Sequence, residues 1–149
     1  LILLDAFSPS RCPSLWTEEF LSKLVRRLIP GGRLITYSSA AAIRKSLIRS
    51  GMKIASIPPC KNEPDKWSNG TIAIRPTKKS NQIYKDTNCR PLSPMEEDHL
   101  LTKAAVPYRD PEGNNSDSQI LKLREEEQKE SKLENTINWK RRWERLNKP

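Results

Sequence analysis

The sequence has few of the residues on which nucleotide sites and hydrolase sites depend. Its 149 residues include five glycines and one histidine. No Gly-x-Gly-x-Gly or Gly-x-Gly-x-x-Gly turn follows a strand-forming run, so a nucleotide cofactor lacks its usual cradle. A Walker sequence and a Gly-x-Ser-x-Gly elbow are also absent. Because His99 lies alone in a polar segment, the sequence does not favour a Ser-His-Asp hydrolase.

Cysteines and long apolar runs are scarce as well. The three cysteines are odd in number, widely spaced and without a Cys-x-x-Cys pair; they are Cys12, Cys60 and Cys89. Since only His99 could join them, no metal site is expected. The apolar opening at residues 1–4 ends at Asp5 and is too short for a signal-peptide core or a membrane span. We therefore predict a cytoplasmic protein without a membrane partner.

Positive charge, by contrast, is abundant. Lys and Arg number 27 against 18 Asp and Glu, which gives a net charge of +9 spread along the whole length. This balance favours polyanionic partners such as nucleic acid, through phosphate contacts and counterion release, although a basic soluble surface would have the same composition. The apolar fraction of 35% and the charged fraction of 30% are lean for a full-length core, so part of the chain is not expected to pack.

The first half of the chain alternates between strand and helix patterns. An uninterrupted Leu/Ile run at residues 1–4 predicts a fully buried parallel strand; since no Met precedes it, we expect a truncated chain or an unusual start codon. Thr17 is a predicted N-cap, and Pro30-Gly31-Gly32 stops the helix that it begins. Ser39 is the predicted cap of a second helix, which ends at Gly51. Further strands are predicted at residues 33–38, 52–57 and 70–74.

This order of elements predicts an α/β fold. Strands joined by helices form parallel, right-handed crossovers, whereas the last two strands are joined by a loop and can pair antiparallel. The pattern is that of half of a doubly wound sheet, whose chemistry lies beyond the carboxyl ends of the parallel strands. The two loops that matter for function are therefore residues 5–9 and 37–40.

The composition changes after Pro76, where apolar residues become rare and Lys, Asn, Asp and Ser dominate. We predict a domain over residues 1–76, a linker over 77–92 and a helical, partly disordered, charged extension over 93–149. The segment Ser93-Pro94-Met95-Glu96 is a capping box that begins the first helix of the extension. Two further helices are predicted at residues 117–132 and 139–146.

Asp5 is the residue best suited to carry chemistry, because it lies where a strand meets the loop Asp5-Ala6-Phe7-Ser8-Pro9. A carboxylate at a strand end can orient an amine or hydroxyl acceptor and accept its proton. Phe7 and Pro9 would form a rigid wall beside it. The alternative is a structural role, in which Asp5 caps the loop or pairs with an arginine.

Two basic clusters are candidates for contact with RNA. Arg44, Lys45 and Arg49 are predicted on the outer side of the second helix, with Arg33 nearby; they would form either a phosphate-contacting patch or a plain solvated face. Trp139-Lys140-Arg141-Arg142-Trp143 interleaves aromatic residues with cations, which suits base stacking. Two tryptophans four residues apart on a helix equally suit docking against the domain.

Three segments together resemble a known family. They are Leu-Leu-Asp-Ala-Phe-Ser-Pro at residues 3–9, Pro-Ser-Leu-Trp-Thr at 13–17 and Pro-Gly-Gly-Arg-Leu-Ile-Thr-Tyr-Ser-Ser-Ala at 30–40, followed by Arg44 and Gly51. Over residues 1–75 the chain is similar to the MnmC-like methyltransferases, which act on the modified wobble uridine of tRNA. Residues 92–111 look like the extension found on cyanobacterial members.

The resemblance implies the C-terminal half of a class I, Rossmann-like methyltransferase sheet, followed by a partly helical charged tail. It implies methyl transfer from S-adenosyl-L-methionine to the aminomethyl group of wobble uridine 34, with the anticodon loop of tRNA as the partner. Asp5 matches the family's aspartate that faces the acceptor amine, and Phe7 and Pro9 match residues that shape its pocket. The predicted substrate-binding residues are Phe7, Pro9, Tyr37, Ser38 and Arg44.

The departure from the family is large. Its first three strands, its glycine-rich turn and its acidic ribose-binding residue would all precede Leu1, so most contacts to the cofactor are expected to be missing. The chain alone is expected to bind S-adenosyl-L-methionine weakly or not at all, and its first strand to leave an apolar edge unpaired. The competing interpretation is a non-catalytic, basic RNA-binding or interaction remnant of such an enzyme.

Overall fold

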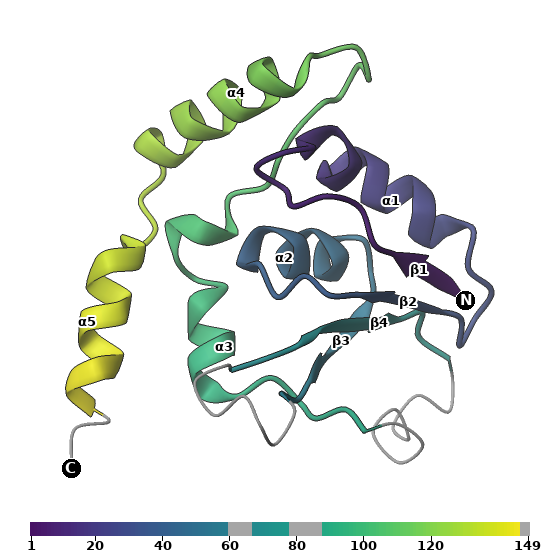
Figure 1. The fold of residues 1–149 in the computed structure, drawn as a ribbon, viewed down its shortest axis with the longest axis horizontal. Coiled ribbons are helices and arrows are strands. Elements are labelled where there is room, and N and C mark those ends of the chain that lie inside the picture. The colour runs from purple at the N-terminus through teal and green to yellow at the C-terminus, as the bar shows by residue number, and fades with distance from the viewer. Residues whose placement is uncertain (60–66, 78–87, 147–149) are drawn as a thin grey trace.

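Among the residues that the structure describes, four strands form one mixed sheet in the order β1-β2-β4-β3 (Figure 1). The computed structural model describes residues 1–59, 67–77 and 88–146. The strands are β1 (Ile2–Leu4), β2 (Arg33–Thr36), β3 (Lys53–Ile57) and β4 (Gly70–Ile74). β1 runs parallel to β2, while β4 runs antiparallel to both β2 and β3. The predicted α/β fold and the antiparallel pairing of the last two strands are confirmed.

Two helices connect the strands and lie together over the sheet (Figure 1). They are α1 (Glu18–Arg26) and α2 (Ala41–Arg49). The predicted N-cap of α1 is confirmed, because Thr17 Oγ1 accepts a hydrogen bond from the Phe20 N–H at 3.2 Å. The predicted N-cap of α2 is wrong by one residue. Ala40 is the N-cap rather than Ser39, and its N–H donates to the Ser38 hydroxyl at 3.4 Å.

The main apolar core lies between these helices and the sheet, and residues of the extension join it. Its buried members are Trp16, Leu21, Val25, Leu28, Leu34, Ala42, Ile43, Leu47, Met52, Ala73, Tyr108 and Ile120. Tyr108 and Ile120 come from beyond the predicted domain boundary at residue 76. Burial of a large apolar side chain contributes about 1.5–3 kcal/mol, so the extension adds stability to the sheet domain as well as length.

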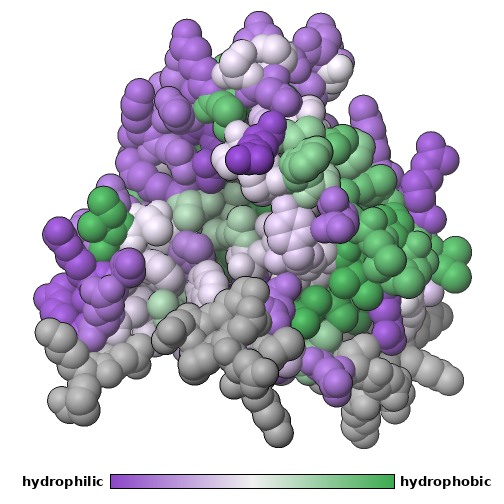
Figure 2. All heavy atoms as spheres, in the orientation of Figure 1, coloured by the Kyte–Doolittle hydropathy of each residue, from purple (hydrophilic) through white to green (hydrophobic). Residues whose placement is uncertain are grey.

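β1 is an edge strand, and the prediction that residues 1–4 form a fully buried strand is wrong. Side chains alternate between the two faces of a strand. Ile2 and Leu4 pack against the core, whereas Leu3 is 70% exposed and Leu1 is 78% exposed. The apolar run is therefore buried on one face only. Figure 2 shows apolar side chains gathered on the side of the molecule where β1 lies.

In the described residues of the extension there are three α-helices. They are α3 (Pro94–His99), α4 (Asp117–Glu130) and α5 (Thr136–Leu146). α4 lies above α1 and α2, and α5 lies beside α3 at the edge of the molecule (Figure 1). The predicted capping box at Ser93 and Glu96 is present, and α4 begins with a second one at Ser116 and Gln119. The helical character of the extension is thus confirmed. The linker predicted at residues 77–92 falls largely outside the described residues, and the domain division stays a prediction.

Replacing Gly70 by Ala is expected to lower the free energy of unfolding by about 2–4 kcal/mol. Gly70 has a φ of +150°, and a Cβ atom there would lie 2.2 Å from the Thr36 carbonyl oxygen. Gly113 is the matched control, because its φ is +75° but no atom lies within 4 Å of the added Cβ. Gly113→Ala should cost only the backbone strain, about 1 kcal/mol. Equal losses in urea unfolding would contradict the close approach at Gly70.

Candidate active site at the strand ends

The 5–9 loop follows β1 and presents Asp5 and Phe7 to solvent. Asp5 is exposed, Phe7 is 75% exposed and Pro9 is half-buried. A turn closes the loop, since the backbone N–H groups of Arg11 and Cys12 donate to the Ser8 carbonyl at 2.8 and 3.0 Å. A carboxylate and an aromatic side chain are thus available on one short, folded loop.

The side chains of Trp16 and Tyr37 fix this loop by hydrogen bonds to its backbone carbonyls. Trp16 is fully buried, and its Nε1–H donates to the Phe7 carbonyl at 2.6 Å. The Tyr37 hydroxyl donates to the Ala6 carbonyl at 2.8 Å. The two rings meet edge to face, with centroids 6.0 Å apart and an interplanar angle of 86°. The sequence motif contained Trp16, but its indole N–H, which fixes the loop, had no predicted role.

The two predicted strand-end loops meet where the Tyr37 hydroxyl donates to the Ala6 carbonyl, next to Asp5. Burial raises the pKa of Tyr37, and the negative charge of the Asp5 carboxylate raises it further. The phenol is therefore neutral at physiological pH and lies within the field of Asp5. Ser38, the next residue, is 5% exposed, and its carbonyl accepts a hydrogen bond from Thr71 at 2.7 Å. Ser38 supports the loop from within rather than facing solvent.

The prediction that Arg44 lies on the outer side of α2 is wrong. Arg44 is 1% exposed, and its guanidinium forms an ion pair with Glu96 of α3 at 2.9 Å. It shares the inner side of α2 with Ile43 and Leu47, which are both fully buried. A buried guanidinium needs a carboxylate and hydrogen-bond acceptors around it, and the fold provides them. Arg44 is therefore not available to a phosphate.

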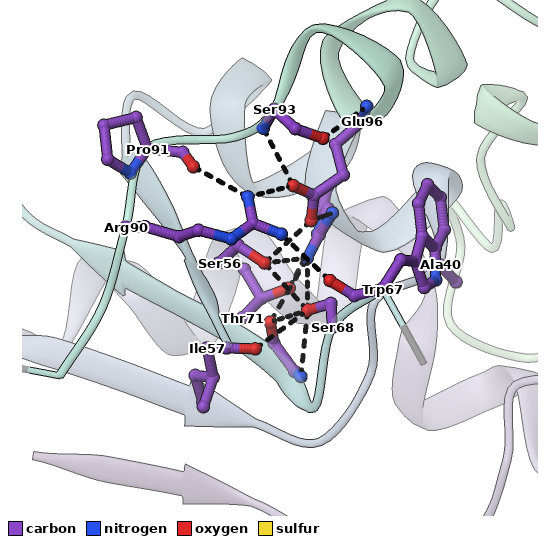
Figure 3. Close-up of polar contacts among 12 residues, drawn as sticks. Ala40, Ser56, Ile57, Trp67, Ser68, Thr71, Arg90, Pro91, Ser93 and Glu96 are labelled. Carbon is purple, nitrogen blue, oxygen red and sulfur yellow. Dashed lines mark hydrogen bonds and ion pairs between the residues drawn. The ribbon is translucent and has the colours of Figure 1, made fainter. Parts of the chain in front are cut away.

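The acceptors around Arg44 form what we call the Arg44–Glu96 network (Figure 3). Arg44 Nε donates to Thr71 Oγ1 at 2.9 Å, and Nη2 donates to Ser68 Oγ, the Gly70 carbonyl and Ser56 Oγ at 3.0, 3.2 and 3.3 Å. Glu96 accepts from Ser56 Oγ at 2.7 Å, from the Ser93 N–H at 2.8 Å and from Arg90. Every guanidinium nitrogen of Arg44 thus has a partner.

Glu96 is ionised throughout the physiological range. Burial alone raises its pKa, but the hydrogen bonds from the Ser93 N–H, the Ser56 hydroxyl and the two arginines outweigh burial and hold the pKa at about 2. Burial likewise lowers the pKa of Arg44, while its hydrogen bond and ion pair with Glu96 oppose that effect. The network is therefore a charged one, with two guanidinium groups around one carboxylate.

Acid is expected to weaken the network. The pKa of Glu96 is about 2 in the folded chain against an ordinary value of 4.5, so its contribution to stability is complete above about pH 4.5 and is lost as the pH falls toward 2. The difference in unfolding free energy between the wild type and Glu96→Gln should shrink by about 2–3 kcal/mol between about pH 6 and pH 2. Urea unfolding at several pH values measures it. The exposed neighbour Glu97 is the control, and a pH-independent difference for Glu96→Gln would contradict the assignment.

The other residues of the predicted basic patch on α2, Lys45 and Arg49, do not form a cluster of free cations with Arg44. Arg49 is exposed but pairs with Glu18 at 3.0 Å, and Lys45 is half-buried. With Arg44 inside the protein, α2 presents no group of three free cations. The alternative interpretation, an ordinary solvated helix face, describes Arg49 better than a phosphate site does.

The Trp139–Trp143 segment packs mainly against α3 of the extension, whereas the docking role predicted for it was against the domain. Trp139 is 5% exposed and stacks on His99, with ring centroids 4.3 Å apart. The ring centroid of Trp67 lies 6.1 Å from that of Trp139. Trp143 Nε1–H donates to Asp98 at 2.6 Å. Burial lowers the pKa of His99, so the stacked imidazole is neutral near pH 7. The two indoles bind α5 to α3 and are not free to stack on bases.

No group of three or more metal-ligating side chains occurs in the part of the chain that the structure describes. Cys12 and Cys89 are free thiols, and Cys60 lies outside the described residues. Within the same residues, no helix combines the length and the apolar character that crossing a bilayer requires.

The two strand-end loops lack the glycine-rich turn that usually holds a nucleotide cofactor such as the implied S-adenosyl-L-methionine. Neither strand-end loop contains glycine, and Gly31 and Gly32 follow a helix rather than a strand. A backbone that approaches a nucleoside or carboxylate closely needs glycine after a strand. What the 5–9 and 37–40 loops offer is an acidic and aromatic surface, which suits an acceptor substrate better than the cofactor.

Comparison with known proteins places this surface in context. Residues 1–65 match the model of a family described as S-adenosyl-L-methionine-dependent methyltransferase. An uncharacterized protein from Methanocaldococcus jannaschii is 32% identical over 135 residues, which cover 89% of this chain and 34% of that protein. The tRNA 5-methylaminomethyl-2-thiouridine biosynthesis bifunctional protein MnmC from Caulobacter vibrioides is 33% identical over 73 residues, or 49% of this chain and 12% of that protein.

A solved structure agrees with these relatives. MNMC2 from Aquifex aeolicus matches with a TM-score of 0.68 and 29% identity, over 87% of this chain and 39% of that one. The chain thus spans well under half the length of each of these relatives. Sequence and fold together confirm that the chain resembles the S-adenosyl-L-methionine-dependent methyltransferases of the MnmC type, as its strand-end motifs predicted.

Proposed function

We propose that this chain forms the acceptor side of a methyltransferase that uses S-adenosyl-L-methionine to methylate the aminomethyl group of wobble uridine 34, with tRNA bound through its anticodon loop. The observation that carries the proposal is the exposed Asp5 on a loop held in place by Trp16 and Tyr37. The name of the Caulobacter relative, a tRNA 5-methylaminomethyl-2-thiouridine biosynthesis protein, supports this choice of substrate.

Asp5 supplies what an aminomethyl acceptor requires. Such an amine is largely protonated near pH 7, and its nitrogen lone pair becomes available only after the proton leaves. A carboxylate in the 5–9 loop orients the ammonium group and accepts its proton. The hydrogen bonds to the Ala6 and Phe7 carbonyls fix the backbone beside Asp5, which lowers the entropic cost of a productive arrangement.

Phe7 and Tyr37 give the surface its aromatic character. Phe7 is 75% exposed beside Asp5, and an exposed ring on a rigid loop can stack on a base at about 1–3 kcal/mol per base. The Tyr37 hydroxyl donates its one hydrogen to the Ala6 carbonyl, so its oxygen can only accept further hydrogen bonds. In this proposal Phe7 and Pro9 contact the base, and Tyr37 borders the surface beside Asp5.

Methyl transfer to defined tRNAs tests the proposal. The protein, as its gene encodes it, is incubated with methyl-labelled S-adenosyl-L-methionine and with tRNA that carries an aminomethyl group on uridine 34, or with the same tRNA lacking that group. Label should enter only the first tRNA. If both tRNAs bind equally and neither is labelled, the chain is an RNA-binding protein, a role that its net charge of +9 also suits.

A further inference from the structure

The Arg44–Glu96 network reaches the candidate active site through a row of hydroxyl side chains. Thr36 of β2 lies opposite Thr71 of β4, and on the other side of β4 Thr71 lies opposite Ser56 of β3. All three are at most 2% exposed. Because Thr36 is the last residue of β2, the row ends directly at the 37–40 loop. Figure 3 shows Ser56 and Thr71 beneath Glu96.

Thr71 joins the network to the loop. Its Oγ1 accepts a hydrogen bond from Arg44 Nε at 2.9 Å and donates to the Ser38 carbonyl at 2.7 Å. The Ser38 N–H in turn donates to Thr36 Oγ1 at 3.2 Å. Both polar groups of the backbone at residue 38 are therefore held by buried hydroxyls, which fixes the position of the preceding residue, Tyr37.

Glu96 sets the orientation of Arg44. A guanidinium is planar and rigid, so a contact at one nitrogen determines where the others lie. Glu96 Oε1 holds Nη1 at 2.9 Å, and the same oxygen accepts from Ser56, whose Oγ also contacts Nη2. Since α3 carries Glu96, the extension determines whether Nε points at Thr71.

We propose that Glu96 is a positioning residue of the candidate active site: acting through Arg44 and Thr71, it holds the 37–40 loop so that the Tyr37 hydroxyl stays on the Ala6 carbonyl beside Asp5. The extension is then part of the site and not an attached tail. This inference deepens the proposed function. It rests on that function in one respect, since it takes the 5–9 loop as the place where the reaction occurs.

Thr71 offers the sharpest test, since Thr71→Val removes the hydroxyl at nearly constant volume and Thr71→Ser keeps it. The first measurement is an NMR titration of ring-labelled tyrosine, in which Tyr37→Phe assigns the Tyr37 signal. The second is amide exchange at Ser38. In Thr71→Val the measured pKa of Tyr37 should fall toward its ordinary value, and Ser38 exchange should become about tenfold faster, as expected for one lost hydrogen bond. Thr71→Ser should restore both.

Glu96→Gln tests the same contacts from Glu96, which lies at the end farthest from the 37–40 loop. It should change Tyr37 and Ser38 in the same direction as Thr71→Val, whereas Glu97→Gln, at an exposed position on the same helix, should change neither. If Thr71→Val fails to fold, the comparison of the two glutamate variants decides. Tyr37 and Ser38 values equal to wild type in folded Thr71→Val or in Glu96→Gln would overturn the proposal.

These readings need neither tRNA nor cofactor, so they separate this inference from the proposed function. An inactive wild type whose Tyr37 responds as described would contradict the proposed function alone. Normal methyl transfer in Glu96→Gln, together with an unchanged Tyr37, would contradict the positioning role alone.

Discussion

Asp5→Asn is expected to reduce methyl transfer to uridine 34 by about 10²–10⁴-fold, the usual contribution of a positioned general base. Asn keeps the size of the side chain but cannot accept a proton from an ammonium group. Because Asp5 is exposed and the 5–9 loop is held through backbone carbonyls of Ala6 and Phe7, the fold and the affinity for tRNA should change little. The measurement is the single-turnover rate at saturating tRNA, with tRNA affinity determined separately.

Glu112→Gln is the matched control, since Glu112 is an exposed carboxylate of the extension, far along the chain from both strand-end loops. It should leave the rate unchanged. If Asp5→Asn weakens tRNA binding as much as it slows transfer, Asp5 contributes binding and not proton transfer. That result would count against a role for Asp5 as the base that faces the acceptor amine.

Arg44→Ala is expected to lower the free energy of unfolding by about 3–5 kcal/mol, the cost of breaking a buried ion pair from one side. The variant leaves Thr71, Ser68 and the Gly70 carbonyl without their guanidinium partner. A loss of this size is a large part of the 5–15 kcal/mol that stabilises a typical domain. Urea unfolding monitored by tryptophan fluorescence measures it.

Arg49→Ala on the same helix is the control for Arg44→Ala. Arg49 is also paired with a glutamate, Glu18, but its side chain is 44% exposed, and an exposed ion pair contributes about 0–1 kcal/mol. The two substitutions therefore remove the same side chain from one helix at very different depths. Similar losses of unfolding free energy for both variants would contradict the buried role of Arg44. A change in the salt dependence of tRNA binding by Arg44→Ala, without a loss of stability, would also contradict it and would support the surface role predicted from the sequence.

The elements of the fold could be predicted because their signals are local. Thr17 and Ser93 begin helices with side-chain caps, which are signals within a few residues of the chain. The end of α1 was placed less well, since the helix ends at Arg26, before the predicted stop at Pro30 and Gly31. The position of Asp5 was also predictable, because it follows from the end of an apolar run. The pairing of the 5–9 and 37–40 loops followed from the general rule for parallel strands.

The partners of the buried polar groups could not be predicted, because their contacts are distant in the sequence. Arg44 pairs with Glu96, 52 residues later, and a charged residue on a helix is normally placed toward solvent. Glu96 already had a local explanation as the glutamate of the capping box that Ser93 begins, so nothing in the pattern indicated its second partner. Leu3 was misplaced for a similar reason, since a three-residue strand does not reveal which of its faces is covered.

The separation between Arg44 and Glu96 also has a consequence for folding during synthesis. Chains emerge from the ribosome N-terminus first, so β1 to β4 and both connecting helices are complete before α3 exists. Until Glu96 has been synthesised, the interior beneath α2 must either hold the positive charge of Arg44 without its carboxylate partner or stay open to water. The nascent sheet is therefore expected to close only when α3 reaches it, and a ribosome stalled before residue 93 would carry an unfinished domain.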